Sequence, residues 1–118
     1  MQINGLRFIM LASTDIERSI AFYRDRLSLA LTARFEDFAF FDCGGTTLAL
    51  SGALARGAAK SGTSLEIVFG VPSVKAAFDE LRATGIEFVN EPRAVNASAW
   101  AVNLNDPDGH LLSFYGDF

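Results

Sequence analysis

The chain has 118 residues and a mass of 12.8 kDa, which is the size of one compact domain. Half of its residues are hydrophobic and 20% are charged, a composition that excludes intrinsic disorder. The net charge is −4 and the positive charges are scattered, so we expect no nucleic-acid partner, which would need a basic stripe.

The only cysteine, Cys43, excludes an intrachain disulfide and fits a reducing compartment such as the cytoplasm. The first residues lack the basic start and the long apolar run of a signal peptide, and they are too short an apolar run for a membrane span. We therefore expect a cytoplasmic protein without a membrane partner.

The first half of the chain predicts a strand, a helix and three more strands. Short apolar or alternating runs predict the strands at residues 6–12, 30–36, 38–43 and 46–51. Thr14 and Glu17 have the spacing of a capping box, which predicts Thr14 as the N-cap of the helix. The apolar stripe of that helix consists of Ile16, Ile20, Tyr23 and Leu27.

The second half repeats this order after residues 52–63, whose small residues predict a linker. Val74, Phe78 and Leu81 form a helical stripe that ends at Gly85. Strands are predicted at residues 65–70, 86–90, 99–105 and 111–115, with a turn at 106–109 before the last.

The two halves can be aligned, which indicates an internal duplication. Phe8 aligns with Glu66, and Asp15 aligns with Ser73. Further along, Asp42 aligns with Asp106 and Ala49 with Ser113. We therefore expect one α+β domain over residues 1–118, built from two paired βαβββ modules (1–51 and 64–118) that form a curled sheet around a cleft.

Two motifs resemble the vicinal oxygen chelate superfamily, which includes glyoxalase, extradiol dioxygenases, fosfomycin-resistance enzymes and bleomycin-resistance binding proteins. The segment from Asp15 to Arg24 resembles the first-helix motif of that family. The segment from Asp106 to Leu112 resembles its last turn and the strand that follows. The resemblance covers nearly the whole chain and implies a homodimer.

The resemblance also implies where a divalent metal would be bound, because each half of the family's enzymes supplies one ligand from its first strand and one from its last. Carried over residue by residue, these positions are Phe8, Ala49, Glu66 and Ser113. Of these only Glu66 binds a hard metal well, and a single histidine, His110, excludes a multi-histidine site. We therefore predict no metal and no cofactor, as in the family's metal-free binding members.

The alternation of side chains along the strands predicts a ligand-binding face that is apolar with a few polar groups. Trp100 either packs under the long loop before it or stacks on a ligand, and we include it. The expected ligand-binding residues are Phe8, Met10, Phe41, Ala49, Glu66, Val68, Trp100, Asn103, Ser113 and Tyr115. The opposite, aliphatic face of the strands is expected to meet the helices.

These patterns favour metal-independent binding of a small hydrophobic or aromatic molecule, with sequestration of an antibiotic or toxin as a plausible use. The alternative is a superfamily enzyme, a lyase, isomerase or dioxygenase, with an atypical metal site or with Glu66 as a base. A third hypothesis is a regulatory or interaction module without a ligand. Glu66 is the only catalytic candidate, and its structural interpretation is a pairing with Arg7 or Arg93. Cys43 is expected to be an inert thiol.

Overall fold

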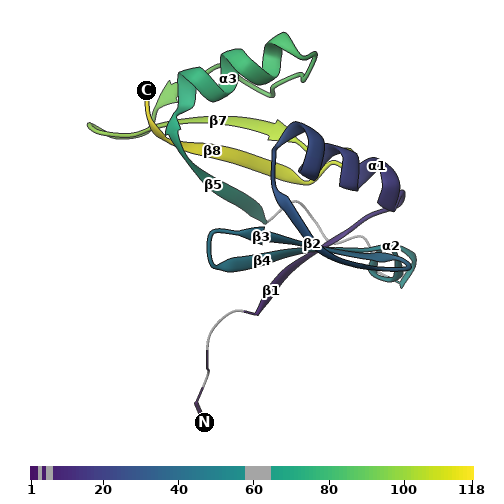
Figure 1. Cartoon of the computed structure of the whole chain (residues 1–118). Coiled ribbons are helices and arrows are strands. Elements are labelled where there is room, and N and C mark those ends of the chain that lie inside the picture. Colours follow the sequence, from purple (N-terminus) through teal and green to yellow (C-terminus); the bar gives the residue numbers. More distant parts are fainter. Residues whose placement is uncertain (3, 5–6, 58–64) are drawn as a thin grey trace. The chain divides into compact units, whose positions relative to one another are not determined.

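The structure is a computed structural model that describes residues 1–2, 4, 7–57 and 65–118. The chain divides into two compact units, Met1–Ser61 and Gly62–Phe118, and each unit contains one four-stranded mixed sheet with a helix (Figure 1). Each unit has the order β, α, β, β, β, so the predicted α+β fold of two βαβββ modules is confirmed.

In the first unit the sheet order is β1-β4-β3-β2, and only the β1–β4 pair is parallel. A parallel pair needs a crossover connection, which the helical segment after β1 begins. The elements are β1 (Phe8–Ala12), α1 (Ile16–Ile20), the π-helical η1 (Ala21–Arg26), β2 (Ala30–Phe35), β3 (Phe38–Cys43), β4 (Thr46–Ser51) and α2 (Gly52–Gly57).

The second unit repeats this arrangement with the sheet order β5-β8-β7-β6, in which β5 and β8 are parallel. The helix α3 contacts the three longer strands of the sheet (Figure 1). The elements are β5 (Glu66–Ser73), α3 (Val74–Ala83), β6 (Arg93–Ala94), β7 (Trp100–Asn105) and β8 (Leu111–Asp117). No helix in the described part of the chain is long and apolar enough to cross a membrane.

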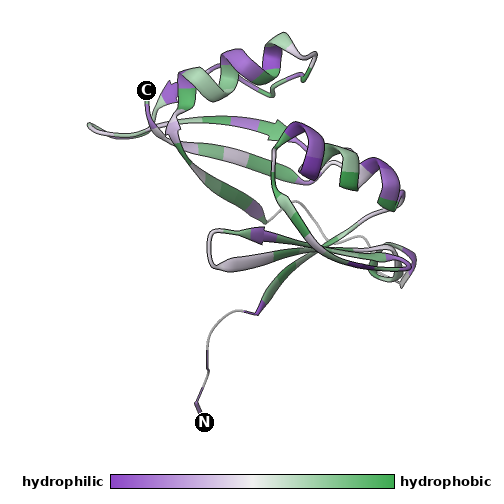
Figure 2. Cartoon of the chain, viewed as in Figure 1, coloured by the Kyte–Doolittle hydropathy of each residue, from purple (hydrophilic) through white to green (hydrophobic). Residues whose placement is uncertain are grey.

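Each sheet has a helix face, which packs against the helix of its own unit, and an open face on the other side. Because side chains alternate along a strand, every second residue belongs to the same face. The helix faces were predicted to be aliphatic, and the structure adds the aromatic rings of Phe41 and Phe114 to them. The helix α3 itself carries both hydrophobic and hydrophilic residues (Figure 2). The buried residues of the helix faces are Leu11, Phe41, Leu48 and Leu50 in the first unit, and Ile67, Val102, Leu104, Leu112 and Phe114 in the second.

The N-caps of the two equivalent helices are Asp15 and Ser73, so the prediction of Thr14 as a cap is wrong by one residue. The Asp15 carboxylate accepts a hydrogen bond from the backbone N–H of Arg18 at 3.1 Å. The Ser73 hydroxyl accepts one from the backbone N–H of Ala76, also at 3.1 Å. A carboxylate at this position also interacts favourably with the helix dipole.

The predicted linker 52–63 is helical where it is described, because Gly52–Gly57 form α2. The Ser51 hydroxyl accepts a hydrogen bond from the backbone N–H of Leu54 at 2.9 Å, and Arg56 pairs with Asp37. Both contacts fix the start of the segment against its own unit. Residues 58–63 lie outside the described part of the chain.

The strand predicted at 86–90 is not formed. This segment makes one isolated bridge, between Phe88 and Leu104, and one backbone hydrogen bond from Val89 to Asn103 at 2.9 Å. Pro92 has no N–H with which to continue a ladder, and the edge of the sheet is instead formed by Arg93–Ala94.

Phe41 was expected on the ligand-binding face, and the strand register shows that this is wrong. Phe41 pairs with Leu48 on the helix face, is fully buried, and lies 5.8 Å from Tyr23 between ring centroids. Phe40 is the residue that pairs with Ala49 on the open face.

The cause is a difference of one residue between the two hairpin turns. Residues 43–46 separate the paired Asp42 and Thr47, whereas residues 106–110 separate the paired Asn105 and Leu111. A shift of one residue moves a side chain to the other face of a strand. Phe40, not Phe41, is therefore the equivalent of Asn103.

This register predicts different stabilities for two neighbouring variants. Phe41→Ala opens a cavity beside Tyr23 and is expected to lower the free energy of unfolding by about 3–5 kcal/mol. Phe40→Ala removes a half-buried ring from the open face and is expected to cost less than half as much. Urea unfolding followed by circular dichroism measures both, and equal losses would contradict the register.

Candidate functional site

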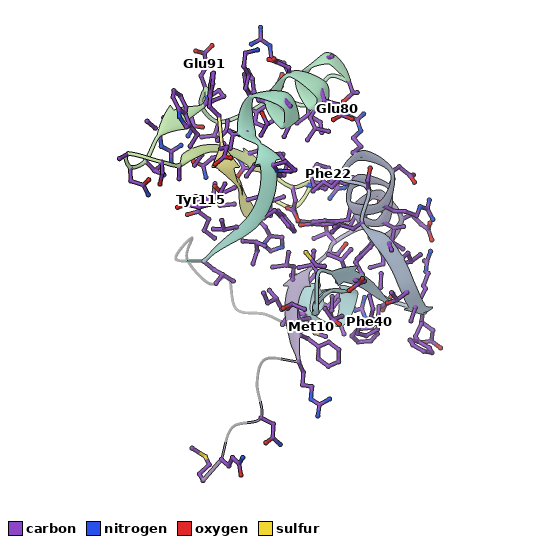
Figure 3. The ribbon with its side chains drawn as sticks, turned by 60° about the vertical axis from the view of Figure 1, so that its left-hand side comes forward. Met10, Phe22, Phe40, Glu80, Glu91 and Tyr115 are labelled. Atoms are coloured by element: carbon purple, nitrogen blue, oxygen red, sulfur yellow. The ribbon has the colours of Figure 1, made fainter. Side chains whose placement is uncertain are left out.

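The open face of the first sheet is apolar around Phe8, Met10 and Phe40, and its polar side chains, Asp42, Thr47 and Ser51, lie at other positions of the same face. Three of the predicted site residues, Phe8, Met10 and Ala49, lie on it. The ring of Phe40 lies 5.6 Å from that of Phe8 and 6.3 Å from that of Phe35, measured between centroids (Figure 3). Phe8 is 52% exposed and Phe35 is 64% exposed. At the position of Ala49, this face has a methyl group and therefore no polar side chain that could orient a ligand.

The open face of the second sheet carries five more of the predicted residues. Val68, Ser113 and Asn103 lie in register on three adjacent strands and form one row across the sheet. Tyr115 lies two residues beyond Ser113 on β8, and Glu66 two residues before Val68 on β5. The structure thus brings polar and apolar groups together on this face, as the alternation predicts.

Asn103 is the centre of a hydrogen-bond network on this face and is only 6% exposed. Its Nδ2 donates to Oε1 of Glu66 at 2.9 Å and to the backbone carbonyl of Leu112 at 3.2 Å. Its Oδ1 accepts from Nδ2 of Asn90 at 3.0 Å and from Nη1 of Arg93 at 2.9 Å. Every hydrogen-bonding position of the Asn103 amide is therefore used.

Asn90 is held in place from both directions, because its Oδ1 also accepts the backbone N–H of Asn103 at 2.9 Å. Sequence reasoning missed Asn90, which lies in a segment without periodicity. Arg93 was considered only as an ion-pair partner of Glu66. In the structure the two charged side chains do not pair with each other, and both bind the amide of Asn103.

The residues at the four implied metal positions do not fit a metal site. Phe8 and Ala49 in the first unit have only hydrocarbon side chains. Ser113 is a hydroxyl and a poor ligand at neutral pH, and one oxygen of Glu66 already accepts a hydrogen bond. Within the described ranges, no group of three histidine, cysteine, aspartate or glutamate side chains is close enough to hold a metal ion.

Trp100 is not on the open face with the other predicted residues. It is separated from Asn103 by an odd number of positions along β7, which places it on the opposite face. Its ring packs against that of Phe118, with the centroids 4.2 Å apart. Trp100 thus packs against the C-terminal residue, whereas the sequence analysis considered packing under the preceding loop or stacking on a ligand.

Asp106 has the turn role that was expected of it. Its carboxylate accepts the backbone N–H groups of Asp108 at 2.9 Å and of His110 at 2.8 Å, and it is almost fully buried. Cys43 is half-buried at the end of β3, and burial together with the neighbouring charge of Asp42 raises the pKa of its thiol.

A groove of about 500 Å³ lies between the C-terminal part of α3 and the segment 86–91, and the sequence did not predict it. The guanidinium of Arg82 lies over the ring of Phe78, 5.4 Å from its centroid. The groove is lined by Phe78, Arg82 and residues 86–91, so Asn90 lies between this groove and the Asn103 network.

The model of one protein family, described as the glyoxalase/bleomycin resistance protein/dioxygenase superfamily, matches residues 5–114 of this chain. An uncharacterized protein of Bacillus subtilis, YraH, is 28% identical over 120 residues, covering 91% of this chain and 94% of that protein.

Two solved structures have the same fold. A glyoxalase/bleomycin resistance protein/dioxygenase from Nocardioides is 25% identical with a TM-score of 0.80, covering 100% of this chain and 86% of that one. A lactoylglutathione lyase from Agrobacterium tumefaciens is 18% identical with a TM-score of 0.79, covering 98% of this chain and 96% of that one.

Removing the centre of the network should destabilise the second unit. Asn103→Ala removes the acceptor of Nδ2 of Asn90 and a donor to the carbonyl of Leu112, and we expect a loss of about 1–3 kcal/mol. Asn105→Ala, at an exposed position of the same strand, is the matched control and should change stability by less than about 0.5 kcal/mol. Urea unfolding measures both, and equal stabilities would contradict the role of Asn103.

The raised pKa of Cys43 predicts slow alkylation at neutral pH, because the thiolate is the reactive form. The rate of iodoacetamide labelling in the native protein should lie below that of the urea-unfolded chain at pH 7.5. The labelling rate of the native protein should keep rising at pH values at which the rate of the unfolded chain has already levelled off. A native rate at neutral pH equal to the unfolded rate would show that Cys43 is not shielded.

Proposed function

The chain belongs to the glyoxalase/bleomycin resistance protein/dioxygenase superfamily, and we propose that it binds a small hydrophobic or aromatic organic molecule without a metal ion. Sequestration of an antibiotic or other toxic compound is the use that fits such binding best. Glu66 contacts the ligand in this proposal and does not act as a metal ligand.

The observation that carries the proposal is the chemistry of the four implied metal positions. A phenyl ring, a methyl group and a hydroxyl stand at Phe8, Ala49 and Ser113, and the carboxylate of Glu66 is engaged by Asn103. The open faces nevertheless keep what an organic ligand needs, which is exposed apolar surface with a few oriented polar groups.

The apolar part of the open face of the first sheet also supports a homodimer, which the family resemblance implies. Phe8, Met10 and Phe35 are all exposed on it, and a patch of this kind on a soluble protein is a surface that a partner covers. We propose a second copy of this chain as that partner.

The first experiment measures metal and ligand binding separately. The purified protein should contain no stoichiometric metal, and its melting temperature should not rise with Ni²⁺, Zn²⁺, Mn²⁺ or Fe²⁺. Compounds from a library of small aromatic molecules should raise it by about 10 °C when present at a hundred times their dissociation constant.

Variants identify the site. Glu66→Ala should reduce the rise in melting temperature given by such a compound, and Glu80→Ala, at an exposed position of α3, should leave it unchanged (Figure 3). One metal ion bound per chain and lost in Glu66→Ala would overturn the proposal. Turnover of a library compound that disappears in Glu66→Gln would instead favour the enzyme with Glu66 as its base.

A further inference from the structure

We propose that the open face of the second sheet binds the head of a small zwitterion that carries an aromatic group, with Glu66 facing its cation and Arg93 facing its anion. An α-amino acid with an aromatic side chain is the simplest ligand of this class. The inference rests on the proposed function and specifies its ligand.

First, the side-chain amide of Asn103 has no hydrogen-bonding group left for a ligand. Its two N–H groups and both acceptor positions of its oxygen are used inside the protein. Asn103 is therefore a positioning residue, which fixes where the side chains of Glu66 and Arg93 end.

Second, the side chains of Glu66 and Arg93 keep most of their hydrogen-bonding atoms for a ligand. Glu66 engages only Oε1, and Arg93 engages only Nη1, in the contacts of the described residues. Both side chains are exposed, and they are not paired with each other although both reach one amide. Asn90 and Leu112 also bind the amide of Asn103, and they are neutral partners.

Third, a partly apolar surface formed by Val68, Ala101, Ser113 and Tyr115 lies on the same face as these charges. Ser113, which is small and buried, lies beside Val68, which is 56% exposed. Ala101, which is also small and buried, lies beside Tyr115, which is 42% exposed. Small side chains leave room above the sheet, and the ring of Tyr115 offers a stacking partner. The ammonium of a ligand can then bind Glu66 and its carboxylate the guanidinium of Arg93, while its aromatic ring lies on this surface.

The test uses four probes that differ only in their charged groups. L-Phenylalanine has both charges, 2-phenylethylamine only the cation, 3-phenylpropanoate only the anion, and 2-phenylethanol neither. Isothermal titration of the full-length protein should give an affinity for L-phenylalanine about tenfold above that for each singly charged probe, with 2-phenylethanol weakest.

Two substitutions assign the charges. Arg93→Gln should bring the affinity for L-phenylalanine down to that for 2-phenylethylamine and leave 2-phenylethylamine unaffected. Glu66→Gln should bring it down to that for 3-phenylpropanoate in the same way. The matched controls are Arg82→Gln and Glu80→Gln, which remove one positive and one negative charge from α3. They should leave the affinities for all four probes unchanged.

Equal affinities for the four probes, or the same losses in the α3 controls, would overturn the zwitterion while leaving the proposed function intact. Absence of binding of every probe at about 10 mM also overturns it. In that case, compounds that raise the melting temperature in the library experiment show that the proposed function stands, and their absence shows that both fail.

Discussion

A buried amide that must satisfy all its hydrogen-bonding groups organises the open face of the second sheet. Asn103 is buried on β7, an interior strand of the four-stranded sheet, where an unpaired polar group is costly. Its four partners come from β5, the segment 86–90, β6 and β8. One side chain thus joins an irregular segment and a two-residue edge strand to the sheet, together with their backbone contacts to β7.

The duplicated modules keep their helix faces alike and differ on their open faces. Both helix faces consist of aliphatic and aromatic side chains beneath one helix. On the open faces, the equivalents of Phe8 and Phe40 are Glu66 and Asn103. Packing against a helix requires hydrocarbon of a given volume, whereas an open face is free to change its chemistry. At these equivalent positions the first open face is thus apolar, and the second is polar or charged.

The membership of a superfamily that includes enzymes does not by itself give this chain a reaction, because the fold is shared and the chemistry is local. Here the positions that the resemblance assigns to metal ligands hold three residues that bind no metal well. What remains on the second open face is a neutral amide that binds both a carboxylate and a guanidinium, and the binding that we propose uses these two charged groups. Binding is the activity that such an arrangement supports most directly.

The sequence by itself determined the duplication, the βαβββ order and most of the helix-facing residues, because these depend on local periodicity and on motifs of fixed spacing. It did not determine that Phe40, and not Phe41, lies on the open face, since one extra residue in a distant turn decides the register. Nor did it reveal Asn90 and Arg93 as partners of Asn103. Both lie in an aperiodic stretch whose position is set by long-range hydrogen bonds, and only the tertiary structure fixes those.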